Sequence, residues 1–424
     1  MVPTEPSAPG DTPDTQTQSA GSYYSDPHVF PLVEETPGPA HDGDARVLLF
    51  SQRNVERPVW HGGMYEFEDI IMSIDRVRML APKRRSGSRA LHLGRRLHST
   101  ARERFGLTRF LYSEPVRVDG QYDLFFAVFH FAWQLSYLHQ LKEWRERSKK
   151  AVCFIIEQWL TEVDDVAPYL EMLRSFDHVF VFSRWSIPRM QALSGTNVEY
   201  MPIGNAALES SPYPEMPART IDVYSIGRRT SGAHEGLVRL MRAERLSYVF
   251  DSIKAGKDPW VNHVEHRALM RHMLKRSRYV LAYRHNDSPE FPARTGGEEA
   301  IPSRYFESIA GGPIVIGSVP QSDDFRTLFD WPDAAIAIPD SKDEIEAAIR
   351  ALDEQPDRIA RARNLNVVNS LRRHDWVYRW RQVLQVAGLQ ELPNAIERMS
   401  ALTNMASQAE QMNGAAGNLL PRLA

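Results

Sequence analysis

The sequence predicts an α/β protein of two successive domains, each built on a parallel sheet. Short apolar runs alternate with helix-like segments along most of the 424 residues, and this alternation indicates a parallel sheet with helices on both faces. A Pro-rich stretch, SSPYPEMPAR at residues 210–219, interrupts the alternation once, as an interdomain linker does. The length agrees with two domains, because one domain usually takes roughly 100–200 residues.

The first domain is expected to cover residues 45–209. It follows residues 1–44, whose many Pro, Ser, Thr, Gly and Asp residues predict a disordered tail. The run ARVLLFSQR at residues 45–53 is typical of a parallel strand that is buried on both faces. After a long irregular and helical region, further strands are expected at residues 122–129, 151–156, 178–182 and 198–203.

The second domain is expected to cover residues 220–374. Strands and helices alternate again there, with strands expected at residues 221–226, 246–250, 279–283, 314–316 and 334–338. No sequence repeat relates the two domains. Residues 391–424 are poor in aromatic residues and rich in Ala, Asn, Gln and Met, so we expect a tail that is a loose helix or disordered.

The composition argues against several classes of protein. The single cysteine, Cys153, excludes a disulfide framework within the chain and a zinc site of several cysteines. The net charge of −3 gives no reason to expect a nucleic-acid partner. The N-terminus lacks the basic start and apolar core of a secretory signal, and the most apolar stretch, residues 122–138, is shorter than the ~20 residues of a membrane helix. We therefore expect a cytoplasmic protein.

Residues 279–317 form the segment that most clearly carries chemistry. They predict a strand, a polar loop, a helix that starts at Ser303, and a returning strand. Ligands of such sheets bind beyond the carboxyl ends of the strands, and the amides at the helix start can bind an anion. Glu299 precedes the helix and Glu307 lies about one turn inside it. Carboxylates accept hydrogen bonds from hydroxyls, so one can face a donor sugar and the other a ribose.

A second candidate is the sequence IDVYSIGRR at residues 221–229. It predicts a strand followed by Gly227 and Arg228. The glycine lets the backbone approach a diphosphate, and the arginine offers a forked donor to phosphate oxygens. For Arg228, a solvated charge on a surface loop is the alternative.

The segment from Glu299 resembles the Glu-x7-Glu region of retaining glycosyltransferases with the GT-B fold, of the group-1 or family-4 type and their spore-protein-like relatives. Their helix reads Glu-Ala-x-Ala-x-Gly-x-Pro-Val-Val, and residues 307–316 read ESIAGGPIVI. The resemblance implies two Rossmann-like domains with a cleft between them. It also implies that Glu307 binds the nucleotide ribose and that Glu299 acts near the anomeric carbon, although Ala300-Ile301 replaces the usual aromatic-glycine pair.

The resemblance extends to the diphosphate site. Family members carry a Gly-Arg pair that precedes a Lys-Gly pair. Gly227-Arg228 matches the first pair, but His234-Glu235-Gly236 stands in place of the second. Arg284 and Arg294 are the candidates for the missing charge.

Three further positions follow from the resemblance. Gly63, in HGGM, resembles the glycine loop that lies under the donor phosphates, and His130 stands where family members place an acceptor-site histidine. Its predicted role is catalytic, and a satisfied core histidine is the alternative. Residues 375–390 resemble the final helix that crosses back onto the first domain.

The resulting hypothesis is a retaining glycosyltransferase that moves a sugar from a nucleotide-sugar donor to a saccharide, lipid-linked or other hydroxyl acceptor in cell-envelope glycan synthesis. No metal or other cofactor is expected, since Asp323-Asp324 follows the site on a different turn. The alternatives are a sugar-nucleotide epimerase and a non-catalytic protein that binds nucleotide sugars or a membrane surface. The basic residues 83–109 suit a peripheral contact at the inner membrane face, or are simply a solvated basic face; nucleic acid is not expected.

Overall fold

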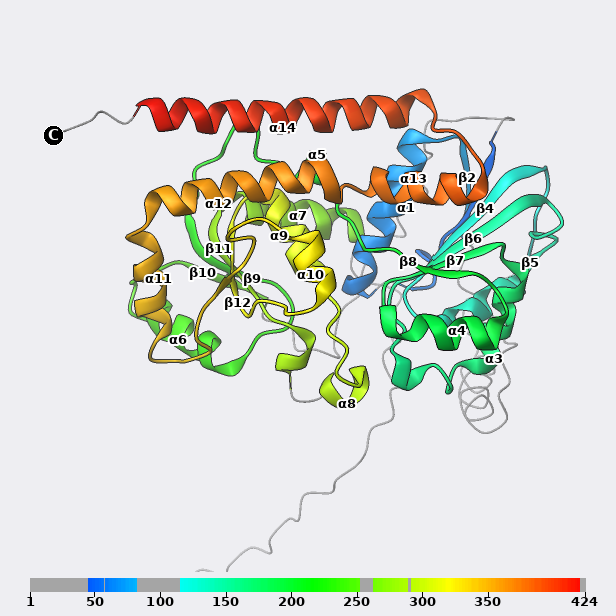
Figure 1. The fold of residues 1–424 in the computed structure, drawn as a ribbon, viewed down its shortest axis with the longest axis horizontal. Coiled ribbons are helices and arrows are strands. Elements are labelled where there is room, and N and C mark those ends of the chain that lie inside the picture. Colours follow the sequence, from blue (N-terminus) through cyan, green and yellow to red (C-terminus); the bar gives the residue numbers. More distant parts are fainter. Residues whose placement is uncertain (1–44, 57, 82–114, 252–261, 289–290, 420–424) are drawn as a thin grey trace, which may run out of the picture.

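The computed structural model describes residues 45–56, 58–81, 115–251, 262–288 and 291–419 (Figure 1). The predicted tail at residues 1–44 and the basic segment at residues 83–109 lie outside these ranges. No helix in the described part of the chain is long and apolar enough to cross a membrane.

The first domain contains a six-stranded parallel sheet in the order β2-β1-β4-β6-β7-β8. Alternate residues of β1 face two different cores: Val47 and Leu49 pack with α1 and α13, and Leu48 and Phe50 pack with the opposite layer. The strands are β1 (Val47–Phe50), β2 (Val77–Leu80), β4 (Tyr122–Phe129), β6 (Ser148–Ile155), β7 (His178–Val181) and β8 (Val198–Tyr200), and the helices are α1 (Gly62–Ile74), α3 (Ala167–Leu170), α4 (Ile187–Ser194) and α5 (Ala207–Ser210).

Short elements complete this domain. The two-residue strands β3 (Val116–Arg117) and β5 (Leu141–Lys142) pair in parallel beside the main sheet. The 3-10 helices are η1 (Val59–His61), η2 (Ala132–Gln140), η3 (Leu160–Glu162), η4 (Glu171–Ser175) and η5 (Arg184–Ser186).

The second domain contains a five-stranded parallel sheet in the order β10-β9-β11-β12-β13. The predicted fold class, α/β with two parallel-sheet domains, is confirmed. The strands are β9 (Ile221–Ser225), β10 (Tyr248–Phe250), β11 (Ser277–Ala282), β12 (Ile314–Gly317) and β13 (Ile336–Ala337). The helices are α6 (Ser231–Arg242), α7 (His263–Arg276), α8 (Phe291–Thr295), α9 (Ser303–Gly311), α10 (Asp323–Leu328), α11 (Ile345–Asp353) and α12 (Pro356–Asn369), with the 3-10 helix η6 (His285–Asp287).

Two helices at the C-terminal end span both domains. After the π-helical turn η7 (Ser370–His374), α13 (Trp376–Ala387) packs on the first domain, where Trp376 stacks on Phe67 with ring centroids 4.6 Å apart. The helix α14 (Pro393–Leu419) then runs back over α12 (Figure 1). Of the two alternatives expected for residues 391–424, a loose helix or disorder, the structure shows a helix over Pro393–Leu419.

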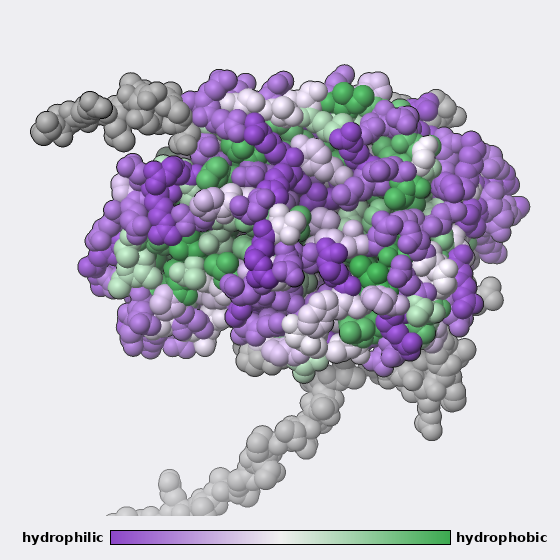
Figure 2. Space-filling view, in the orientation of Figure 1, coloured by the Kyte–Doolittle hydropathy of each residue, from purple (hydrophilic) through white to green (hydrophobic). Residues whose placement is uncertain are grey.

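Arg398 fixes α14 to the junction of the domains. Its guanidinium donates to Asp375, the N-cap of α13, at 2.8 Å, and to Glu209 on α5, also at 2.8 Å. On the face drawn in Figure 2, hydrophobic residues form small separate areas among hydrophilic ones. Helix packing and buried ion pairs therefore hold the two domains in one arrangement.

Candidate functional site

The residues that follow the carboxyl ends of the strands in one domain contact their counterparts in the other. Glu157, after β6, pairs with Arg294 on α8 at 2.9 Å. The ring of Trp159 meets the ring of His285, after β11, with centroids 5.6 Å apart. Both sheets therefore present their ligand-binding edges to the same interdomain region.

Two arginines border the turn that follows β9. Gly227 has φ +71° and its N–H donates to Asp251 Oδ2 at 2.7 Å. Arg304 Nη1 donates to the carbonyl oxygen of Arg228 at 2.8 Å, and a Cβ at Gly227 would lie 3.2 Å from Arg304 Nη2. The guanidinium of Arg228 lies 4.1 Å from the ring centroid of Phe291. Because residue 227 is a glycine, the guanidinium of Arg304 has room at this turn, beside the predicted diphosphate ligand Arg228.

Arg304 was not predicted as a site residue. Burial lowers the pKa of this arginine, although Glu307 and Asp251 oppose the shift. Among the described residues, its one hydrogen bond goes to the Arg228 carbonyl. The signal that could have identified it is its spacing from Glu307, because residues i and i+3 share one face of a helix.

The two arginines expected to supply the missing charge are engaged elsewhere. Arg284 pairs with Asp287 at 2.7 Å and with Glu299 at 3.4 Å. Arg294 pairs with Glu157 and, at 2.6 Å, with Glu162. Arg304 is therefore the better candidate for the second cation near Gly227.

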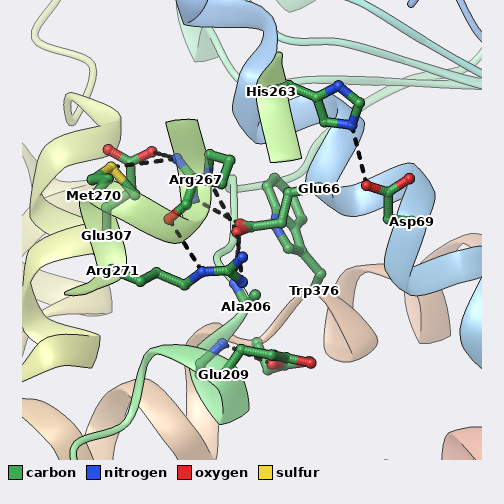
Figure 3. Close-up of polar contacts among 12 residues, drawn as sticks. Glu66, Asp69, Ala206, Glu209, His263, Arg267, Met270, Arg271, Glu307 and Trp376 are labelled. Atoms are coloured by element: carbon green, nitrogen blue, oxygen red, sulfur yellow. Dashed lines mark hydrogen bonds and ion pairs between the residues drawn. The ribbon is translucent and has the colours of Figure 1, made fainter. Parts of the chain in front are cut away.

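Glu307 lies at one end of a buried ionic network (Figure 3). Its side chain is 12% exposed and accepts a short hydrogen bond from Arg267 on α7. Arg267 also donates to Glu66 on α1, with distances of 3.1 Å from Nε and 2.7 Å from Nη2. The second oxygen of Glu307 lies 3.4 Å from the hydroxyl of Ser303, the first residue of α9. Glu307, the residue predicted to bind the ribose, is thus held by Arg267 on one side and lies beside the start of α9 on the other.

Glu299 lies in the loop before α9 and is held by its own domain. It accepts from the backbone N–H of Gln321 at 2.7 Å, besides its ion pair with Arg284. The neighbouring Glu298 instead reaches the first domain, where its Oε1 accepts from the N–H of Trp185 at 3.0 Å. Burial raises the pKa of Glu298 to about 7, against the effect of that N–H. Sequence spacing did not single out Glu298.

On the first domain, His130 forms a pair with Glu157 directly after β4. Nε2 of His130 lies 3.3 Å from Glu157 Oε2. Burial would raise the pKa of Glu157, but His130, Arg294 and the indole N–H of Trp159 hold it at about 2. The carboxylate is therefore ionised at neutral pH.

A second histidine lies beside this pair. The ring of His61 is 5.0 Å from that of His130, and burial followed by the charge of His130 lowers the pKa of His61 well below its usual range. His61 precedes Gly62-Gly63, which forms the first turn of α1 rather than a loop, and a Cβ at Gly63 would meet no atom within 4 Å. The space beside Gly63 is open.

The predicted site residues thus fall into three groups. The first group surrounds the start of α9 and the turn after β9 and consists of Gly227, Arg228, Ser303 and Glu307. The second group, His130 and Gly63, lies on the facing edge of the first domain. Glu299 stands alone in the loop before α9, which contacts the residues that follow β11 and β12. Within the described ranges, no group of three or more His, Cys, Asp or Glu residues is placed to hold a metal ion.

Residues 233–385 match the model of a family described as glycosyl transferase-like. The resemblance to group-1-type glycosyltransferases is confirmed. The matched glycosyltransferase-like region contains Glu299, Ser303, Arg304 and Glu307, and it begins just after the Gly227-Arg228 turn. No curated protein matches the chain.

Solved structures similar to the chain include three with low sequence identity. An alpha-glucosyltransferase in complex with UDP and DNA is 12% identical, with a TM-score of 0.49 over 81% of this chain and 99% of the other. Anabaena HepE in complex with UDP-glucose is 12% identical, with a TM-score of 0.45 over 81% and 99%. TarM is 7% identical, with a TM-score of 0.38 over 62% and 54%. The resemblance to glycosyltransferases therefore rests on the family match and the site geometry, and not on these solved structures.

Proposed function

We propose that the protein is a glycosyltransferase that moves a sugar from a nucleotide-sugar donor to an acceptor hydroxyl. The observation that carries this proposal is the convergence of Gly227, Arg228, Arg304 and Glu307 at the carboxyl edge of a parallel sheet. A glycine turn bordered by two guanidinium groups suits a diphosphate. A carboxylate one helical turn away suits the hydroxyls of a ribose.

The transfer needs stabilisation of the diphosphate as it leaves. Arg228 and Arg304 would neutralise its developing charge, and the amides at the start of α9 would add positive potential. His130, oriented by Glu157, would meet the donor sugar or acceptor from the opposite domain. We propose that configuration is retained, as the family resemblance implies, with the leaving phosphate accepting the proton of the acceptor. No protein nucleophile is then required.

The acceptor class is part of the proposal. A saccharide or lipid-linked hydroxyl of the cell envelope fits the family resemblance, and the net charge of −3 gives no support for a nucleic-acid acceptor. The predicted cytoplasmic location and the contact of residues 83–109 with the inner membrane face remain predictions. They belong to the same hypothesis, since a lipid-linked acceptor is reached at a membrane surface.

The test is a turnover assay with UDP- and GDP-sugars, with nucleoside diphosphate release and product structure as readouts. We expect release of one nucleoside diphosphate, loss of turnover in Glu307→Ala, and an NMR spectrum in which the anomeric configuration of the product equals that of the donor. Binding without any turnover would replace the enzyme proposal with a non-catalytic binding function. An epimerised sugar nucleotide would replace it with an epimerase, and an inverted product would overturn retention alone.

A further inference from the structure

Arg267 joins the two domains through two carboxylates. Its side chain is 5% exposed and lies between Glu66 of the first domain and Glu307 of the second (Figure 3). Nε and Nη2 donate to the two oxygens of Glu66, and Nη1 donates to Oε1 of Glu307. One planar guanidinium therefore holds both oxygens of Glu66 and one oxygen of Glu307 in a fixed geometry, which the rotating donors of a lysine ammonium do not reproduce.

Glu66 is itself held firmly. Its Oε2 accepts from the N–H of Ala206 at 3.2 Å and from the indole N–H of Trp376 at 3.2 Å, and Arg271 lies 3.4 Å from Oε1. These donors come from the N-cap of α5, from α13 and from α7. The anchor of Arg267 is thus set by three elements around the domain junction.

Arg267 packs closely against a glycine of the first domain. A Cβ at Gly62, the first residue of α1, would lie 3.3 Å from Arg267 Cδ. Burial by itself would lower the pKa of Arg267, but Glu66 and Glu307 raise it above its usual range. The guanidinium therefore stays charged, and its position depends on α1 of the opposite domain.

We propose that Arg267 is a positioning residue that orients Glu307 toward the ribose of the donor. Arg267 holds Oε1 of Glu307, which leaves Oε2, with Ser303 Oγ at 3.4 Å, to accept a ribose hydroxyl in a fixed direction. The inference rests on the proposed function, in which Glu307 binds the ribose. It adds that the ribose contact is set by a residue that also grips the first domain.

A purely structural role for Arg267 predicts a different result. Loss of a structural cation would weaken the binding of every nucleotide by the same factor, because the whole donor domain would be disturbed. Loss of a positioning residue removes only the contribution of the ribose hydroxyls. The experiment therefore compares UDP or GDP, whichever the wild type binds more tightly, with its 2′,3′-dideoxy analogue by isothermal titration.

We expect the wild type to prefer the ribose form by about tenfold or more, the size of one hydrogen bond to a charged group. Arg267→Lys should reduce this preference to below about threefold, because the ammonium cannot hold both carboxylates in the same geometry. Arg276→Lys is the matched control: it lies on the same helix, donates to His272 rather than to Glu66 or Glu307, and should keep the wild-type preference. Glu66→Asp, which shortens the anchor and keeps its charge, should reduce the preference in the same direction.

Thermal unfolding of each variant shows whether the protein is folded. If Arg267→Lys does not fold, Glu66→Asp provides the test. The inference fails if the folded variant keeps the wild-type preference for the ribose form, or if both nucleotides weaken by the same factor. The proposed function fails separately, if the wild type binds neither nucleotide.

Discussion

Glu157→Gln tests the two ion pairs of Glu157 most sharply, one with His130 in its own domain and one with Arg294 in the second domain. The substitution keeps the size of the side chain and removes the charge that His130 and Arg294 share. The pKa of Glu157 is about 2 in the folded protein, against a usual value of 4.5. At about 1.4 kcal/mol per pH unit, this difference corresponds to about 3 kcal/mol of folding free energy. Because the folded-state pKa is the lower one, the stabilisation is complete above pH 4.5 and disappears as the pH falls toward 2.

The assay is urea unfolding of the wild type and the variant at pH 7 and pH 3.5. We expect Glu157→Gln to lower the free energy of unfolding by about 2–3 kcal/mol at pH 7 and by about half as much at pH 3.5. Glu162→Gln is the control, since Glu162 pairs with Arg294 from a side chain that is 31% exposed, and it should cost less than about 1 kcal/mol. Equal losses for both variants, or a Glu157→Gln loss that ignores pH, would refute the reasoning.

Three further predictions concern single residues. Arg304→Met should weaken the binding of a nucleoside diphosphate about tenfold or more in isothermal titration, and unchanged affinity would remove Arg304 from the site. Gly236→Ala should lower the free energy of unfolding by about 1–3 kcal/mol, because its Cβ would lie 2.5 Å from Ile345 Cγ2. Gly63→Ala, whose Cβ would lie in open space, should change the free energy of unfolding by less than about 0.5 kcal/mol. Equal changes in the two variants would contradict the packing argument. Burial raises the pKa of Glu298 in the folded protein to about 7, above its usual 4.5, so its charge destabilises the fold as the pH rises through that interval. The free energy of unfolding of Glu298→Gln should therefore exceed that of the wild type by about 2 kcal/mol at pH 8 and equal it at pH 4. An equal difference at both pH values would contradict this reasoning.

The features that the sequence predicts well depend on local signals. The start of α9 at Ser303 and its C-cap at Gly312, where φ is +75°, follow from residues within a few positions of each other. The strand at Tyr122–Phe129 has the bounds expected from its apolar run. The strand β2, at the edge of the sheet among the described residues, was not predicted because Arg78 interrupts its apolar residues.

The contacts between the domains could not be predicted in the same way. Arg267 and Glu66 are 201 positions apart, and neither stands in a motif. Arg294 was expected near the diphosphate, yet the structure pairs it with acidic residues that follow β6. A charged side chain in a sequence does not name its partner, because ion pairs depend on how distant elements pack. Helix spacing could have identified Arg304, three positions before Glu307.

We propose that the second domain holds a nucleoside diphosphate between the Gly227-Arg228 turn, Arg304 and Glu307. The most direct test is the midpoint of thermal unfolding of the wild type and of Glu307→Ala, each with UDP and with GDP. We predict that one of the two nucleotides raises the midpoint of the wild type, since a ligand at 100 times its Kd adds about 2.7 kcal/mol, and that Glu307→Ala loses most of this rise. If neither nucleotide raises the midpoint of the wild type, the donor-site assignment is contradicted.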